Sequence, residues 1–214
     1  MENMQVENPA LGVYIYKNRL PETLKLTERL EKTIEDNKDN FFMWREALVG
    51  DYQKMPDYRD CVDFKVRKAD VEDNAKVKSS DLYNIFTEIN NQLETCLRHY
   101  SGMFNITMQY QEAINFVRYG AGQHFAVHAD AGFSYTCTVS SVVYLNDNYT
   151  GGGLFFPYLN YTYQPSAGDI VFFPSTFLYA HAALPVEDGI KYAAVTMFDY
   201  NDRFHGANST LKQA

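Results

Sequence analysis

Hydrophobic and polar residues change their spacing once along this chain, near residue 105. Before that point the clearest pattern runs from Ser80 to Tyr100, and it predicts a helix. Its apolar residues recur at helical spacing, at Leu82, Ile85, Phe86, Ile89, Leu93 and Leu97. Ser80 can cap this helix, and Gly102 can end it in a left-handed turn. We expect the helix to be a scaffold that packs on a sheet.

The rest of the first hundred residues has weaker patterns. VYIY, from Val13 to Tyr16, reads as a short strand, and Pro21 stands where a helix can begin. That helix would carry an apolar stripe at Leu20, Leu24, Leu30 and Ile34. The segment FFMWREALVG, residues 41–50, is strand-like. Residues 51–78 are charged and irregular, which predicts a partly ordered excursion that could form a lid over a site.

From Asn105 onward, short apolar runs alternate with Gly, Pro, Asn and Asp. These runs predict strands at Ile114–Tyr119, Phe125–Asp130, Val139–Leu145, Leu154–Phe156, Tyr161–Tyr163, Ile170–Phe173, Tyr179–Ala182 and Tyr192–Phe198. So many short strands between turns favour a sandwich or jelly roll over a parallel α/β sheet. Gly151-Gly152-Gly153 is a turn signal, because no phosphate-loop lysine and no helix follow it.

Composition adds limits to this picture. The 214 residues suit one domain, and the 15% aromatic share favours strands over helices. The net charge, 19 − 27 = −8, disfavours general nucleic-acid binding. The acidic N-terminus lacks the apolar region of a secretory signal, and no apolar run approaches the length of about 18 residues that a membrane span needs. We therefore expect no membrane partner and a cytoplasmic location.

The cysteines agree with a reducing compartment. Cys61, Cys96 and Cys137 are odd in number and widely spaced, and no two of them form a CxxC pair. We interpret them as free thiols rather than as a thiolate metal site.

The most informative polar residues are His128 and Asp130, followed later by His181. Residues two apart on a strand point to one face, so His128 and Asp130 could chelate one ion from a single strand. Two imidazoles and one carboxylate are the ligand set that leaves adjacent positions open on non-haem Fe(II). Each residue also has a simpler interpretation, as a hydrogen-bonded strand histidine or a core histidine. We leave His99, His124 and His205 unassigned.

Lys191 follows His181 by 191 − 181 = 10 residues, at the start of the strand-like run KYAAVTMF. Ten residues suffice for a hairpin, which would bring Lys191 near the same site. A lysine buried on an apolar strand needs an anionic partner, so an anionic co-substrate is one interpretation. A surface lysine with a buried stem is the other.

Taken together, the region from about Asn115 to Asp199 resembles the Fe(II)/2-oxoglutarate dioxygenases, and specifically the prolyl 4-hydroxylase-like family. The matching strings are RYGAGQHFAVHAD, VVYLND, GGGLFFP, SAGDIVFFP and HAALPVEDGIKY, in the family's order. The resemblance implies a mainly β fold, a double-stranded β-helix or jelly roll, with helices buttressing one sheet. It implies a single oxygenase domain over residues 1–214, in which 105–204 form the core carrying the site and 1–104 buttress it.

The resemblance also implies roles for particular residues. His128, Asp130 and His181 would hold Fe(II), and Lys191 would pair with the distal carboxylate of the co-substrate 2-oxoglutarate. Tyr144 would donate a hydrogen bond to the same carboxylate, and Tyr119 would line the co-substrate pocket. The implied reaction uses O2 to hydroxylate a protein or peptide substrate, with proline the favoured target, while 2-oxoglutarate is decarboxylated to succinate. Ascorbate would support the enzyme by reducing the iron.

Three departures from the family pattern concern the substrate. Phe125 stands where prolyl hydroxylases usually have a tyrosine, Cys137 replaces an arginine, and Met197 replaces a tryptophan. All three positions belong to the substrate side in the family, so they leave the substrate open. The same chemistry on a free amino acid or other small molecule is therefore an alternative, and a jelly-roll binding protein without catalysis is another. A nucleic-acid demethylase fits less well, because no arginine follows Lys191 until Arg203.

Overall fold

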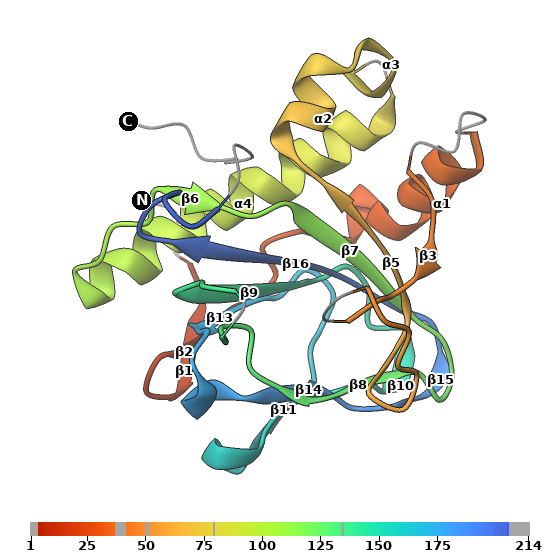
Figure 1. The fold of residues 1–214 in the computed structure, drawn as a ribbon. Coiled ribbons are helices and arrows are strands. Elements are labelled where there is room, and N and C mark those ends of the chain that lie inside the picture. The colour runs from red at the N-terminus through yellow and green to blue at the C-terminus, as the bar shows by residue number, and fades with distance from the viewer. Residues whose placement is uncertain (1–3, 37–41, 50–51, 79, 134, 206–214) are drawn as a thin grey trace.

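Two antiparallel sheets lie face to face, and helices cover the outer face of the larger one (Figure 1). The computed structural model describes residues 4–36, 42–49, 52–78, 80–133 and 135–205. Because the two sheets are stacked, the side chains between them form one inner core and one cavity. The double-stranded β-helix expected from the sequence is confirmed.

The larger sheet has nine strands, in the order β1-β2-β13-β9-β16-β7-β5-β3, with β6 paired to β16. Its strands are β1 (Val6–Ala10), β2 (Val13–Tyr16), β3 (Arg45–Glu46), β5 (Val62–Val66), β6 (Tyr110–Gln111), β7 (Ile114–Tyr119), β9 (Val139–Tyr144), β13 (Ile170–Pro174) and β16 (Lys191–Asp199). β16 is the longest and lies between β9 and β7 near the middle, so it runs along the whole inner cavity.

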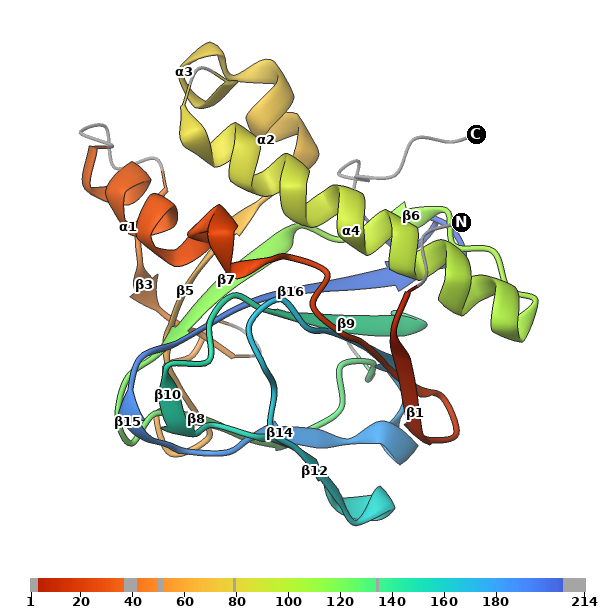
Figure 2. The same ribbon diagram turned by 180° about the vertical axis from the view of Figure 1, so that it is seen from behind.

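The smaller sheet has five strands, in the order β12-β11-β14-β8-β4. Its strands are β4 (Arg59–Asp60), β8 (His124–His128), β11 (Leu154–Phe156), β12 (Tyr161–Tyr163) and β14 (His181–Ala183). A separate pair, β10 (Tyr149–Gly151) with β15 (Val186–Gly189), closes one end of the barrel (Figures 1 and 2). β8 and β14 are neighbours, and His181 of β14 lies directly opposite His128 of β8.

The helices lie on one side of the larger sheet, as Figure 2 shows from behind. They are α1 (Leu26–Asp36), α2 (Lys68–Asp73), α3 (Ala75–Lys78) and α4 (Asp81–Phe104), and the short 3-10 turns are η1 (Glu22–Leu24), η2 (Pro157–Leu159) and η3 (Phe177–Tyr179). The apolar stripe of α4 packs on outward-facing sheet residues such as Phe116, Val143 and Phe172 in one hydrophobic cluster. Among the described residues, no helix is long and apolar enough to cross a membrane.

The ends of α4 differ from the expectation. Ser80 occupies the N-cap position, but its hydroxyl donates to Val77 O instead of capping the helix. The helix continues past Gly102 and ends at Asn105, whose φ of 51° is left-handed. Asparagine tolerates this conformation better than most residues, which is why it can end a helix where glycine is absent.

The segment before α4 is more ordered than its sequence indicates. The strand-like segment 41–50 contributes only Arg45–Glu46 as a strand, and its residues 41 and 50 lie outside the described part. The charged excursion 51–78 instead contains β4, β5, α2 and α3, although residue 51 is not described. β5 was missed because its alternation, VDFKV, holds two charged residues, of which Lys65 lines the inner cavity and Asp63 binds the cavity residues Arg59 and Asn115. Tertiary pairing with β7 overrides this weak local signal.

Most strands after Asn105 form where the pattern predicts them, with two informative differences. The run Tyr179–Ala182 is divided, because η3 ends at Tyr179 and β14 begins at His181. The run Phe125–Asp130 ends early, because β8 stops at His128. Both differences fall beside a histidine of the candidate site. The cysteines Cys61, Cys96 and Cys137 are free and buried.

Candidate active site

His128, Asp130 and His181 come together at the inner face of the smaller sheet. One ligand atom from each lies within 4.8 Å of the others. His128 Nε2 is 3.5 Å from Asp130 Oδ1, and His181 Nε2 is 3.8 Å from Asp130 Oδ2. The cross-strand pairing of His181 with His128 brings the two imidazole rings to 4.4 Å. The group therefore has the spacing of a metal-binding triad.

Both imidazoles are oriented with Nε2 toward Asp130. Nδ1 of His128 lies 2.8 Å from Ala126 O, and Nδ1 of His181 lies 3.1 Å from Tyr179 O. A carbonyl can only accept, so each Nδ1 carries the proton and each neutral ring leaves its Nε2 lone pair free. Burial lowers the pKa of His181, which favours this neutral form. Metal-ligating histidines are commonly fixed in this way by a backbone carbonyl.

Asp130 lies beyond the end of β8, so the strand alternation that predicted its direction does not operate. Ser140 on β9 orients it instead, by donating from Oγ to Asp130 Oδ2 at 2.5 Å, and Ser175 Oγ lies 2.8 Å from Ser140 Oγ. Burial raises the pKa of Asp130, but the two histidines and the Ser140 hydrogen bond outweigh it and bring the pKa to about 2. A carboxylate that is ionised throughout the physiological range suits a cation.

A cavity of about 250 Å³ extends from these residues between the two sheets. Its lining includes the three residues above, Tyr119, Tyr144 and Lys191 at one end, and Arg59, Asn115 and Met197 away from that end. The register along β16 separates the two ends, since Lys191 pairs with Tyr119, whereas Val195 pairs with Asn115. We call the two regions the lysine end and the mouth end.

Lys191 is a buried cation without an acid beside it. Its side chain is 3% exposed, and its Nζ donates to Gly152 O at 2.5 Å. The rings of Tyr119 and Tyr144 each have their centroid 5.4 Å from Nζ, which gives the cation two aromatic faces. Desolvation lowers the pKa of Lys191 to about 7. Gly152, with a φ of +63°, permits this packing, because a Cβ there would lie 3.2 Å from the Lys191 chain.

Tyr144 supplies a second unsatisfied group at the lysine end. Its hydroxyl is buried and has no hydrogen-bond partner, and burial raises its pKa so that it stays a neutral donor. A buried cation and an orphaned hydroxyl in one cavity are what a carboxylate would satisfy. The residues present therefore fit a dicarboxylate co-substrate whose other end reaches the triad.

Of the three positions where the sequence departs from the family pattern, two line the cavity and one does not. Phe125 lines the cavity, and its ring stacks on the His128 imidazole with centroids 3.6 Å apart. Met197 also lines it. Cys137 is buried at 7% exposure and is not among the described residues that line the cavity. Its thiol pKa is raised by burial to about 12.

The unassigned histidines lie outside the triad. Tyr16 Oη is 3.0 Å from His99 Nδ1, His124 Nε2 is 3.3 Å from Asp57 O, and His205 Nε2 is 3.0 Å from Asp199 Oδ2. Each of these contacts is made away from the cavity, so leaving the three histidines unassigned agrees with the structure.

Sequence reasoning missed Arg59, Asn115 and Ser140 as residues of the site. Arg59 comes from β4, in the stretch interpreted as an irregular excursion, and it enters the site because β4 pairs with β8. Asn115 and Ser140 stand in apolar strand runs, where their inward direction is a consequence of register. The alternation of inward- and outward-facing side chains along each predicted strand could have identified Asn115 and Ser140 as inward-facing. No local sequence signal identifies Arg59.

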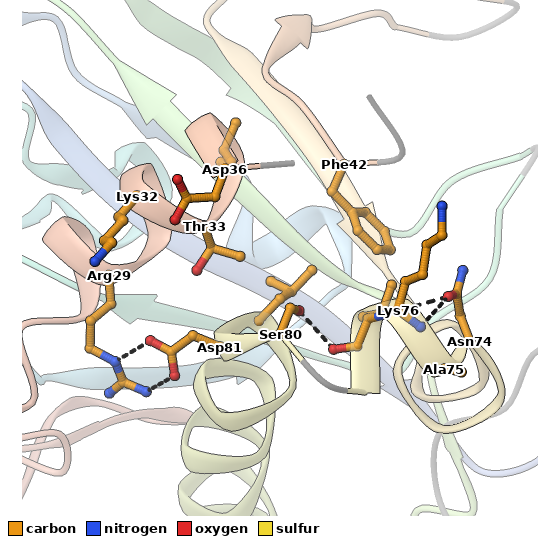
Figure 3. Close-up of a pocket in the computed structure, with 13 residues that line it drawn as sticks. Arg29, Lys32, Thr33, Asp36, Phe42, Asn74, Ala75, Lys76, Ser80 and Asp81 are labelled. Carbon is orange, nitrogen blue, oxygen red and sulfur yellow. Dashed lines mark hydrogen bonds and ion pairs between the residues drawn. The ribbon is translucent and has the colours of Figure 1, made fainter. Parts of the chain in front are cut away.

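A larger cavity lies elsewhere, between α1, α3 and α4, with a volume of about 1030 Å³ (Figure 3). Arg29 faces it and is held by Asp81, with Nε 2.7 Å from Asp81 Oδ2. In the described part of the chain, the only metal-type cluster is the triad, which lies outside this cavity. Cavity volume alone does not identify the candidate site, since the triad lies in the smaller of the two cavities.

Residues 114–199 match the model of the 2OG-Fe(II) oxygenase superfamily, a range that contains the triad, Tyr144 and Lys191. Within this range the chain is similar to the 2OG-Fe(II) oxygenases, which supports an oxygenase of the prolyl 4-hydroxylase-like group.

The proteins that this chain is similar to are prolyl hydroxylases by name. A protein of Acanthamoeba polyphaga mimivirus, provisionally named a prolyl 4-hydroxylase, is 30% identical over 115 residues, which cover 44% of this chain and 48% of that protein. The chain thus spans about half the length of this curated relative. A prolyl hydroxylase from Trichoplax adhaerens, solved with a peptide fragment of the hypoxia inducible factor oxygen degradation domain, superposes with a TM-score of 0.70 at 16% identity, over 88% of this chain and 84% of that one. A Pseudomonas putida prolyl-4-hydroxylase gives 0.65 at 17% identity, over 89% and 93%.

Proposed function

We propose that this protein is an Fe(II)- and 2-oxoglutarate-dependent dioxygenase that hydroxylates a prolyl residue in a protein or peptide. His128, Asp130 and His181 would hold the iron, and Lys191 and Tyr144 would bind the distal carboxylate of 2-oxoglutarate. The observation that carries the proposal is that the triad and the buried Lys191–Tyr144 pair share one cavity. Residues 1–214 would form one oxygenase domain, with 105–204 as its core and 1–104 as its buttress.

When bound, the iron and 2-oxoglutarate supply the oxidising chemistry, in which O2 is consumed, 2-oxoglutarate is converted to succinate and CO2, and a C–H bond is hydroxylated. The chain's own residues bind and orient the reactants. Lys191 and Tyr144 fix the far end of the co-substrate, and Asp130 presents an ionised oxygen held by Ser140. Tyr119 adds an aromatic wall to the lysine end.

The peptide substrate is supported by the relatives rather than by any bound molecule. The Trichoplax protein was solved with a peptide, and both other relatives carry prolyl 4-hydroxylase in their names. Ascorbate enters the proposal as the reductant that keeps the iron ferrous between turnovers. Phe125 and Met197 would face the substrate, since both line the cavity and Met197 lies at its mouth end.

The decisive experiment measures succinate formed from 2-oxoglutarate, and oxidised product by mass spectrometry, with Fe(II), ascorbate and a pool of proline-containing peptides. We expect turnover by the wild type and its loss in His128→Ala and Asp130→Ala, because each removes a ligand from the triad. His124→Ala is the matched control: it removes a histidine from the same strand that contacts only Asp57 O among the hydrogen bonds of the described residues.

Two results would contradict the proposal. Turnover that survives His128→Ala or Asp130→Ala would reject the ligand assignment. A wild-type protein that binds neither Fe(II) nor 2-oxoglutarate in calorimetry would reject the oxygenase activity altogether.

A further inference from the structure

The mouth end of the cavity contains two polar atoms that have no hydrogen-bond partner among the described residues. Arg59 Nε and Asn115 Oδ1 are both buried without a hydrogen-bond partner, and both side chains line the cavity. One is a donor and the other an acceptor. Buried polar groups are normally paired, so two orphans in one cavity indicate a ligand.

Asp63 determines which polar atoms of Arg59 and Asn115 remain without a hydrogen-bond partner. Its Oδ2 accepts from Arg59 Nη2 at 2.7 Å and from Asn115 Nδ2 at 3.1 Å. Because the Asn115 amide nitrogen is used in this way, its oxygen is the part that remains unpaired. Arg59 Nη1 donates to Leu48 O at 3.2 Å, which leaves Nε as the guanidinium donor without an acceptor. We call Arg59, Asp63 and Asn115 the mouth clamp.

The mouth clamp stands beside the triad. Arg59 pairs with Phe125 across β4 and β8, and its guanidinium lies 4.9 Å from the Phe125 ring centroid. Phe125 in turn stacks on the imidazole of His128. Asn115 pairs with Val195, which is 195 − 191 = 4 residues along β16 from Lys191. The clamp is therefore next to the metal ligands. Asn115 lies along β16 on the side away from Lys191, whereas Arg59 is near enough to Tyr119 to interact with it electrostatically.

The charge of the mouth clamp selects the kind of group that fits it. Arg59 and Asp63 form an ion pair and Asn115 is neutral, so the clamp carries no net charge. The neighbouring Cys61 thiol is neutral too, because burial raises its pKa. A carboxylate has no hydrogen for Asn115, and an ammonium has no lone pair for Arg59. A secondary amide offers both, with C=O for Arg59 Nε and N–H for Asn115 Oδ1.

We propose that the mouth clamp binds a main-chain amide of a polypeptide substrate, next to the residue that is oxidised. This inference rests on the proposed function and deepens it, because the clamp pairs with an amide and not with the ammonium or carboxylate of a free amino acid. The charged side chains of Lys65 and Glu112 line the same cavity but are not part of the clamp. Arg59 and Asn115 act as specificity residues that touch the substrate, and Asp63 is a positioning residue. The side-chain amide of Asn or Gln offers the same donor and acceptor as a main-chain amide, so the experiment must distinguish the two.

The test uses the full-length protein with Fe(II), 2-oxoglutarate and a pool of acetylated and amidated peptides with one central proline. Arg59→Lys keeps the charge but removes Nε–H, and Asn115→Leu keeps the size but removes the acceptor. We expect each to raise the KM for the pool by about tenfold or more, since a site built for a hydrogen bond discriminates strongly against its loss. The KM for 2-oxoglutarate should stay within about twofold of the wild type, which also reports correct folding. Arg45→Lys, on an exposed arginine of β3, is the matched control.

A second arm changes the substrate. N-methylation of the amide that meets Asn115 should raise the KM by about tenfold for the wild type and cause no further rise in Asn115→Leu, because the same hydrogen bond is removed from either side. A pool without Asn and Gln should be used as well as the complete pool. If turnover requires Asn or Gln, or if Arg59→Lys and Asn115→Leu behave as the wild type, the proposal is wrong. Turnover of L-proline without turnover of the capped peptide pool also overturns it. If the proposed function itself is wrong, no 2-oxoglutarate is turned over, whichever substrate is added.

Discussion

At the scale of single residues, Lys191 explains most about how the site works. A lysine that is 3% exposed and has only a backbone carbonyl as its hydrogen-bond acceptor is kept at a cost to stability. The cost is understandable if a ligand supplies the missing anion. Lys191 and Tyr144 then form a preorganised carboxylate site that loses little freedom on binding.

Replacing Lys191 should separate binding from stability. In Lys191→Met we expect the Kd for 2-oxoglutarate to rise by about 10- to 100-fold, since a hydrogen bond to a charged group is worth about 1.5–3 kcal/mol. The ligand-free protein should become more stable by about 1–3 kcal/mol, because a desolvated polar group is removed. Calorimetry and urea unfolding at pH 7 measure the two effects. Lys25→Met, on an exposed lysine, is the control, and a loss of stability in Lys191→Met would contradict the argument.

The affinity for 2-oxoglutarate should also depend on pH. Burial lowers the pKa of Lys191 to about 7, so the free site is protonated below this value and loses its charge above it. The dianion binds the charged form, and each pH unit above about 7 should therefore raise the Kd by up to about tenfold. Calorimetric titrations of the wild type from pH 6 to 9 test this. The slope should disappear in Lys191→Met, and a wild-type Kd that is constant over this range would refute the assignment.

Individual residues also show what the sequence can and cannot reveal. His128, Asp130, His181 and Lys191 stand in strings whose spacing was enough to group them before the fold was known. The reason given for Asp130 was nevertheless wrong, since β8 ends two residues earlier and Ser140 orients the carboxylate. Arg59 could not be predicted, because its place in the cavity depends on pairing between β4 and β8, whose partners are far apart in the chain.

At the scale of elements, the N-terminal strands are joined to the jelly roll by one buried carboxylate. Asp169, just before β13, is 1% exposed and accepts hydrogen bonds from four groups. These are Lys17 Nζ at 2.6 Å, Tyr163 Oη at 2.5 Å, Asn18 N at 2.9 Å and Ser166 N at 2.9 Å. The carboxylate thus holds the end of β2 against the start of β13.

Asp169→Asn should be strongly destabilising, because it leaves Lys17 without its partner and puts a donor where four donors converge. Breaking a buried ion pair from one side costs about 3–5 kcal/mol. Urea unfolding followed by circular dichroism measures the change, with Asp188→Asn at an exposed position of β15 as control. The double variant Lys17→Met/Asp169→Asn should recover part of the loss. A decrease of less than about 1 kcal/mol in the free energy of unfolding of Asp169→Asn would mean that the Asp169 carboxylate is not essential for stability.

Elements with a strong local period were predicted well, and the others were not. The apolar stripe of α4 defined that helix, although its end shifted to Asn105, where the backbone becomes left-handed. β5 has no comparable signal, because Asp63 and Lys65 alternate with its apolar residues; Lys65 lines the cavity, and Asp63 holds Arg59 and Asn115 there. Short strands whose inner face is polar for a functional reason are therefore the ones that periodicity misses.

At the scale of the whole molecule, the first 104 residues do more than cover the jelly roll. β2 pairs with β13, β5 pairs with β7, and α4 fills the outer face of the larger sheet. They also bring Arg59 to the mouth of the cavity. The barrel and its N-terminal part share one hydrophobic cluster, which makes them interdependent.

A fragment of residues 105–204 should therefore fail to fold by itself. Without α4, the outward apolar residues Phe116, Val143 and Phe172 would face water, and the strands β13, β7 and β8 would each lose a neighbouring strand. We expect an aggregated or unfolded fragment in size-exclusion chromatography and proton NMR, and a monodisperse full-length chain under the same conditions. A soluble fragment with dispersed amide signals that binds 2-oxoglutarate would show that the core is autonomous.

The pairing of His181 with His128 has a consequence for biosynthesis. The two histidines are 181 − 128 = 53 residues apart, so an ion held by both closes a long loop of the chain, much as a cross-link would. The triad cannot exist until His181 has left the ribosome and β14 has paired with β8. Nascent chains shorter than this hold at most an incomplete ligand pair, which binds iron weakly. Under the proposed function, loading of the metal is thereby postponed until the barrel is nearly complete, and an unfinished chain is spared from carrying redox-active iron.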